Sequence, residues 1–183
     1  MRLLIIAVII LFSTIGLAAQ GKFSTKTGII TFEASVPSFE EVKAVNSDVG
    51  AIVNTDTGEF AALALIKGFR FKVALMEEHF NENYMESSEY PKAVFKGRIV
   101  NFDPAVLTNK AKTMQLAGSL SIREISQSTD IPITVAKVDG KIKITGSFTI
   151  NPGDFDIKIP SIVRNKIAER VDVFVEFNLI GNE

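Results

Sequence analysis

The sequence contains one histidine, His79, whose acidic neighbours could make it a metal ligand. Glu78 precedes it and Glu82 follows three residues later, so on a helix His79 and Glu82 would lie one turn apart and could hold one metal ion together. A closed metal site needs further ligands, and the sequence offers no second histidine and no cysteine. We therefore expect no metal and no other cofactor, and we interpret His79 as a helix residue that hydrogen-bonds locally or caps one end of the fold.

The acidic residues of the chain suggest two other kinds of chemistry. Asp56–Glu59 and Asp154–Asp156 bring carboxylates together, but neither has the ligand spacing of a twelve-residue calcium loop. Glu40–Glu41 and Glu77–Glu78 could be imagined as a glycosidase pair, but adjacent side chains point to opposite faces of a strand and diverge on a helix. The serines have no histidine–acid partner set and no nucleophile-elbow motif. We expect turns and solvated surface at these positions, and a protein that is not an enzyme.

The dominant pattern of the chain is an alternation of apolar and polar residues. Between residues 141 and 150 one side of a period of two carries Ile142, Ile144, Gly146, Phe148 and Ile150. The other side carries lysine, threonine and serine, which predicts a strand with one buried and one wet face. The pattern recurs along the chain and predicts an all-β fold.

Composition limits the class of protein further. The chain has 183 residues, of which 46% are hydrophobic, and this length suffices for one core. A formal net charge of -1 argues against a nucleic-acid partner, because such a protein needs a basic surface to neutralise phosphates. The absence of cysteine means that core burial must stabilise the domain without disulfides.

The first residues have the order of a secretory signal peptide. Arg2 is followed by an apolar run from Leu3 to Leu17 and then by the small residues Ala18 and Ala19. The run is short of the roughly 20 residues that a spanning helix needs, so we favour cleavage near Ala18 or Ala19 over a membrane anchor. No cysteine is available for lipid attachment, so the protein is not expected to be a lipoprotein. We expect residues 1–19 to be the signal peptide and residues 22–183 to form a single exported domain.

The order of elements predicts eight or nine antiparallel strands with little else. We expect a long strand over residues 60–73 with Leu63 and Phe69 on its inner face, and a polar link over residues 126–130. Asp139-Gly140 predicts a tight hairpin. Residues 74–84 change period, since Met76, Phe80 and Tyr84 follow at intervals of four, and predict one short helix that lays this stripe on a barrel. Residues 162–169 could form one or two further helical turns.

Eight antiparallel strands closed into a barrel leave an interior wide enough for side chains or one small ligand. The inward positions are apolar and are the remaining functional candidates, which we list as Phe32, Leu63, Phe69, Phe95, Leu116, Leu120, Ile144, Phe148, Val173 and Phe177. Such a lumen could hold a long hydrophobic chain, with each buried methylene contributing about 0.8 kcal/mol. The alternative is a filled core in an exported structural or stress-related module that binds a protein on its outer surface.

Several short motifs in order carry a resemblance to a known family. They are His79-Phe80, Tyr90-Pro91, Phe95-Lys96-Gly97, Gly118-Ser119-Leu120-Ser121-Ile122-Arg123, Asp154-Phe155-Asp156-Ile157 and Ile159-Pro160. With the signal peptide before them, they make the chain resemble the YceI-like family of exported bacterial proteins. The resemblance implies a lipocalin-like antiparallel barrel, a periplasmic location, and a polyisoprenoid, fatty acid or related amphiphile bound in the lumen. It implies no catalytic residues.

The chain departs from the family pattern in a few places. The family often has a glycine directly after the arginine that corresponds to Arg123, where this chain has Glu124, and it often has a histidine near its first strand, where this chain has none. These departures bear on the ligand and on how its headgroup is held, and not on the fold. Transient contact with a membrane and a homodimer both stay open at this stage.

Overall fold

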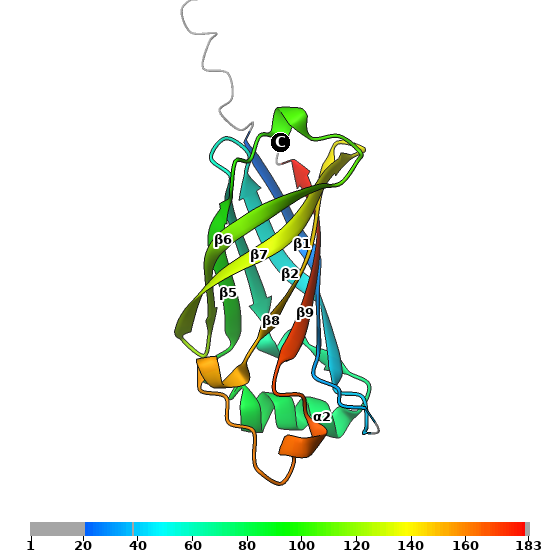
Figure 1. The fold of residues 1–183 in the computed structure, drawn as a ribbon, viewed down its shortest axis with the longest axis vertical. Helices are drawn as coiled ribbons and strands as arrows, with labels where there is room; N and C mark the ends of the chain where they lie inside the picture. The colour runs from blue at the N-terminus through cyan, green and yellow to red at the C-terminus, as the bar shows by residue number, and fades with distance from the viewer. Residues whose placement is uncertain (1–20, 38, 182–183) are drawn as a thin grey trace, which may run out of the picture.

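The computed structural model describes residues 21–37 and 39–181, and within them the chain is an antiparallel β-barrel (Figure 1). Eight strands close the barrel, and they are β1 (Lys22–Glu33), β2 (Lys43–Asn54), β3 (Glu59–Leu65), β5 (Lys92–Ile99), β6 (Lys112–Ile122), β7 (Ile125–Val138), β8 (Lys141–Ile150) and β9 (Val171–Gly181). A ninth strand, β4 (Arg70–Phe71), adds two residues at the edge of β2. The predicted all-β class and strand number are therefore confirmed. The signal-peptide prediction lies outside the described residues.

The strands follow one another round the barrel, and β1 closes it by pairing with both β2 and β9. The Asp139-Gly140 turn between β7 and β8 has both residues at positive φ, as the hairpin prediction requires. A second turn of the same kind joins β6 to β7 at Arg123 and Glu124, with φ of 49° and 64°. Residues 126–130 consequently lie within β7, and the polar link expected there is wrong.

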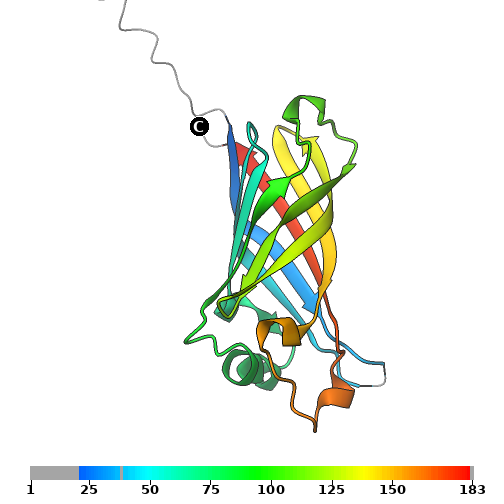
Figure 2. The same cartoon turned by 60° about the vertical axis from the view of Figure 1, so that its left-hand side comes forward.

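The two ends of the barrel differ. Across one end, which we call the mouth, lies the helix α2 (Ala74–His79), continued by one π-helical turn, η2 (Phe80–Tyr84). The 3-10 turns η4 (Pro152–Phe155) and η5 (Arg164–Lys166) lie at the same end (Figures 1 and 2). The opposite end, which we call the packed end, holds the turn η3 (Pro104–Val106) and both ends of the described chain (Figure 1). The helix predicted over 74–84 and the turn predicted within 162–169 are both present.

Neighbouring strands part toward the mouth at two places. β7 pairs with β8 only from Ile133 onward, and Gln127 of β7 instead donates a hydrogen bond from Nε2 to the carbonyl oxygen of Asp154 in η4, at 2.8 Å. β2 and β3 pair only over residues 50–53 and 60–63, and beyond that point the fully buried Asn46 donates from Nδ2 to the carbonyl oxygen of Leu65, at 2.9 Å. Polar side chains therefore satisfy backbone groups where the ladders end.

The strand expected over residues 60–73 is wrong in extent and in phase. It ends at Leu65, and a 3-10 turn, η1 (Ile66–Gly68), separates it from β4. In β3 the alanines Ala62 and Ala64 face inward, whereas Leu63 is 40% exposed on the outer face. Both phases of this strand are apolar, so a period of two could not decide between them.

Candidate functional site

The interior of the barrel is packed at one end and hollow at the other. The inward residues near the mouth line a cavity, whereas those near the packed end fill a core. On β6, for example, Leu120 lines the cavity and Leu116 lies in the core. On β9 the same division separates Val173 from Phe177. The fully buried branched side chains of the packed end are Val49, Val53, Ile99, Ile133, Val135, Ile142, Ile144 and Leu179.

Three phenylalanine rings lie in the core next to this boundary. Phe60 packs against Phe95 and Phe177 with ring centroids 6.3 Å and 5.6 Å apart. Gly97 and Gly118 pair across β5 and β6, and a Cβ on either would come within 2.9 Å of the Phe95 ring. The two glycines therefore leave the space that the Phe95 ring occupies, and the three phenylalanines fill the core beyond the residues that line the cavity.

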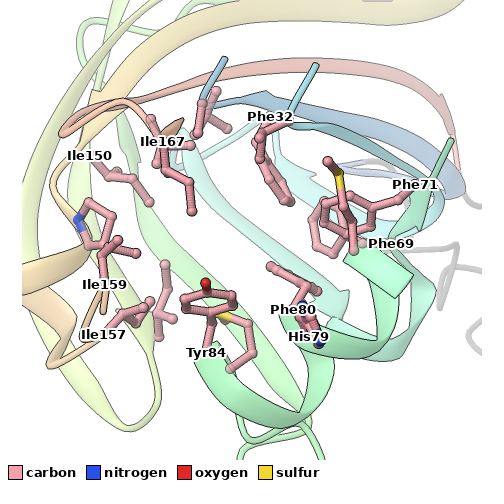
Figure 3. Close-up of a pocket in the computed structure, with 18 of the residues that line it drawn as sticks. Phe32, Phe69, Phe71, His79, Phe80, Tyr84, Ile150, Ile157, Ile159 and Ile167 are labelled. Carbon is pink, nitrogen blue, oxygen red and sulfur yellow. The ribbon is translucent and has the colours of Figure 1, made fainter. Parts of the chain in front are cut away.

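The cavity has a volume of about 450 Å³ and opens at the mouth. Its wall comes from the mouth-side ends of the strands, from the α2–η2 helix and from the loop after η4 (Figure 3). This volume lies in the range of small-molecule sites, and its lining is predominantly apolar, as in such sites. The space is therefore suited to an apolar guest.

One wall of the cavity is a cluster of four phenylalanines, Phe32, Phe69, Phe71 and Phe80 (Figure 3). Their ring centroids lie 5.2 to 5.8 Å apart in five pairs, with tilted or edge-on geometry. The cluster joins β1, β4 and the helix, so it fastens the helix to the rim while leaving ring faces and edges toward the cavity.

The helical stripe covers the mouth as its spacing predicts. Met76, Phe80 and Tyr84 all line the cavity, although the list of expected lumen residues omits them. Their four-residue spacing could have identified them, because it already predicted that this side of the helix lies on the barrel. The loop residues Ile157, Ile159 and Ile167 also line the cavity, and no periodicity marked them.

Four lining residues carry polar side-chain groups: Glu40, His79, Tyr84 and Lys166. Glu40, His79 and Lys166 are exposed, whereas Tyr84 is half-buried and its hydroxyl points into the cavity (Figure 3). Burial raises the pKa of Tyr84, so the phenol stays neutral at physiological pH. Within the described residues this hydroxyl has no hydrogen-bond partner from the protein, which leaves a neutral donor and acceptor facing the hollow space.

Arg123 ties the segments of the mouth together. Its side chain is 14% exposed, with Nη2 2.5 Å from Oε2 of Glu86 and Nη1 donating to the carbonyl oxygen of Asp156. Its guanidinium also lies 5.2 Å from the centroid of the Tyr90 ring. Arg123 therefore connects the β6–β7 turn to the segment after the helix and to the end of η4. Several of the motif residues that carry the family resemblance thus have a structural role at the mouth.

The ten expected lumen residues divide into three groups. Five line the cavity: Phe32, Phe69, Leu120, Phe148 and Val173. Four lie in the packed core instead: Phe95, Leu116, Ile144 and Phe177. Leu63 faces outward, and its expected place in the lumen is wrong. Alternation identifies the inward face of a strand, but it does not say how far along the strand the interior is filled.

The residues considered for other chemistry lie apart. His79 is exposed at the rim on α2, and among the described residues no three or more histidine, cysteine, aspartate or glutamate side chains form a group that could hold a metal ion. Asp56 lies in the turn between β2 and β3, and Asp154 and Asp156 lie in and just after η4. In the part of the chain that the structure describes, no helix is both long and apolar enough to cross a bilayer.

Comparison with known proteins agrees with this geometry. A model of the YceI-like domain matches residues 10–179 of the chain. A polyisoprenoid-binding domain from Saccharophagus degradans, implicated in plant cell wall breakdown, superposes with a TM-score of 0.76 at 13% identity, covering 89% of this chain and 99% of that one. BcnA from Burkholderia cenocepacia superposes with a TM-score of 0.69 at 14% identity, covering 83% of this chain and 95% of that one.

A YceI protein from Campylobacter jejuni superposes with a TM-score of 0.58 at 16% identity, covering 78% of this chain and 88% of that one. A search of curated proteins finds no match. At identities of 13% to 16%, these solved structures show that the chain has the same fold.

Proposed function

The chain belongs to the YceI-like domain family, and we propose that its cavity binds, without catalysis, the hydrocarbon chain of an isoprenoid, a fatty acid or a similar amphiphile. The observation that carries this proposal is the apolar cavity of about 450 Å³ at the mouth. The polyisoprenoid-binding description of the Saccharophagus degradans domain, which has the same fold, supports it. A filled core, which the protein-interaction alternative requires, does not fit a barrel with an apolar cavity of about 450 Å³ at its mouth.

The size of the cavity sets the scale of the guest. At roughly 30 Å³ for a group the size of a water molecule or a methylene, about fifteen such groups would fill it. Fifteen buried methylenes at about 0.8 kcal/mol each would contribute on the order of 12 kcal/mol, and an association cost of about 4 kcal/mol would leave binding in the micromolar range. A longer chain would extend through the mouth.

The polar groups suggest how the guest is oriented. Glu40, His79 and Lys166 lie at the exposed rim, so a charged or hydrated headgroup would stay there. Tyr84 is the lining residue that presents a neutral hydroxyl inside the cavity, where it could hydrogen-bond to a hydroxyl, ester or carbonyl oxygen near the top of the chain. The apolar wall beyond it would hold only hydrocarbon.

The proposal places the protein outside the cytoplasm. The order of residues 1–19 is that of a cleaved signal peptide, and no cysteine is available to retain the chain as a lipoprotein. We infer a periplasmic domain, residues 22–183, that carries or sequesters its ligand there. Mass spectrometry of the protein recovered from an exporting host would give its N-terminus and test the cleavage.

Native mass spectrometry of the same material would test the ligand. We expect one bound lipid per protein, which organic solvent should extract. After the lipid has been removed, a fluorescent polyene fatty acid should bind to the empty protein. Ala93 lines the cavity and Val94, its neighbour on β5, belongs to the opposite face. Ala93→Phe should therefore reduce binding of the probe at least tenfold, whereas Val94→Phe should leave it unchanged. A protein that carries no lipid and ignores acyl and prenyl probes would contradict the proposal.

A further inference from the structure

The loop that closes one side of the mouth, residues 157–168, has an unusual outer surface. Toward the cavity it presents apolar side chains, among them Ile159 and Ile167. Away from the cavity it presents Ile162, which at 82% exposure is the most exposed large hydrophobic residue of the described chain. An isoleucine held this far into solvent has no role in the packing of this chain.

The charges of the same loop are of one sign. Lys158, Arg164 and Lys166 fall within residues 157–168, and no acidic residue does. All three are exposed. Lys158, whose side chain is 88% exposed, has its Nζ 3.9 Å from Oδ1 of Asp156 just before the loop, a surface pair of small energetic weight. An apolar tip with basic residues on both sides is the composition of a segment that enters the headgroup region of an anionic bilayer.

The loop is anchored at both ends. The backbone N–H of Ile157 donates to the carbonyl oxygen of Pro152, and that of Ala168 donates to the carbonyl oxygen of Ala34, just beyond the end of the neighbouring strand β1. Arg123 holds Asp156 just before the loop. The loop therefore projects from the mouth end while its inner side stays on the cavity (Figures 1 and 2). The acidic residues Asp156 and Glu169 flank the loop directly, and Glu40 and Glu78 come from other segments of the mouth. The basic residues therefore lie within the loop, next to its apolar tip, and the surface that could face an anionic membrane is centred on Ile162 and Arg164.

We propose that residues 157–168 dock the mouth on the surface of an anionic lipid bilayer, with Ile162 entering the interface and Lys158, Arg164 and Lys166 contacting lipid phosphates. This inference rests on the proposed function, because it supplies the route by which a hydrocarbon chain reaches the cavity. The inner side of the docked loop is the cavity wall, so a chain could pass from membrane to barrel with little exposure to water.

Vesicle co-sedimentation tests the docking surface. Vesicles of phosphatidylcholine are compared with vesicles that contain about one third phosphatidylglycerol, since each basic residue near an anionic surface is worth roughly a fivefold gain in partition. The protein recovered after export should bind the anionic vesicles at least tenfold more strongly. Ile162→Glu should remove at least nine tenths of that binding, and the double variant Lys158→Glu/Arg164→Glu should weaken it at least tenfold. Leu63→Glu, on the barrel wall, is the matched control and should change nothing.

Binding of the fluorescent fatty acid in solution, without vesicles, is measured on the same variants and should be unchanged in all of them. This arm reports on the cavity alone. If the unchanged protein ignores anionic vesicles, binds neutral ones equally well, or binds normally after Ile162→Glu, the docking proposal is overturned even when the probe binds in solution. Absence of probe binding would instead overturn the proposed function. If this surface binds a protein partner instead, the unchanged protein should not bind anionic vesicles.

Discussion

The two halves of this barrel are built from the same strands and are stabilised in different ways. At the packed end, branched side chains and the rings of Phe60, Phe95 and Phe177 fill the interior. At the mouth, the strands part, the interior is hollow, and polar contacts through Asn46, Gln127 and Arg123 hold the segments together. The comparison indicates that the packed half supplies most of the folding free energy and thereby allows the other half to stay empty.

A hollow apolar space has an energetic cost, because its lining atoms lack contact partners on one side. The four-phenylalanine cluster limits that cost, since Phe32 and Phe80 pack on each other at 5.3 Å while still bordering the cavity. The rim can therefore keep its shape without a ligand inside. A bound chain would restore the missing contacts, so we expect ligand to raise the stability of the mouth more than that of the packed end.

The largest expected difference between the halves is the response to removal of a ring. Phe177→Ala, in the packed core, should lower the free energy of unfolding by about 3–5 kcal/mol. Phe148→Ala, on the cavity wall, should lower it by only about 1–2 kcal/mol, because one side of the ring already faces empty space. Chemical denaturation of the ligand-free proteins measures both. Equal losses would mean that the halves are not differently packed.

The second test removes a polar tether. Arg123→Met retains much of the apolar stem but loses both the Glu86 pair and the hydrogen bond to Asp156. We expect a loss of about 2–3 kcal/mol, since hydrogen bonds to a charged group are among the stronger ones. Hydrogen exchange should increase at the mouth segments and not in the packed strands. Uniformly faster exchange would show that the tether stabilises the whole barrel and not its mouth.

The boundary between the halves can be located with one strand. Ala62 and Ala64 lie on the same inner face of β3, but only Ala64 lines the cavity. Ala62→Leu should destabilise by about 1–2 kcal/mol through overpacking. Ala64→Leu should be tolerated, because its added atoms enter hollow space, and should weaken binding of a fatty-acid probe instead. Reversed effects in the denaturation and binding measurements would place the boundary elsewhere.

The smallest effect concerns the turn at the mouth end of β6 and β7. Glu124 has a φ of 64°, a region that costs most residues free energy but not glycine. Glu124→Gly should raise the free energy of unfolding by about 0.5–1 kcal/mol, net of the greater freedom of glycine in the unfolded chain. Thermal and chemical unfolding would measure the gain. A loss of stability would indicate that the Glu124 side chain makes a favourable interaction in solution.

The same turn shows why part of the fold could be predicted and part could not. Asp139-Gly140 and Arg123-Glu124 adopt the same left-handed backbone, but only the first has residue types that favour it. Without a turn signal at 123–124, the polar residues that follow had the composition of a link. They are polar because the mouth-side half of β7 has no β8 partner and Gln127 contacts η4 instead.

The candidate site was predicted in outline for a similar reason. Alternation gave the inward faces of β1, β6, β8 and β9, and the four-residue spacing of Met76, Phe80 and Tyr84 gave the cover of the mouth. Neither pattern indicates how far along a strand the interior is filled. Phe148 and Ile144 were therefore both expected in the lumen, although only Phe148 lines the cavity. The isoleucines of residues 157–168 follow an irregular loop, and their place in the wall depends on contacts distant in sequence.

The described chain begins and ends at the packed end, where Phe23 pairs with Gly181. An affinity tag or a surface linker joined to either terminus would therefore stand clear of the opening. Protein immobilised through its C-terminus on a sensor should present the mouth outward to vesicles, in an orientation that the fold itself imposes. Any fusion partner added there would also leave exchange of guest molecules unobstructed.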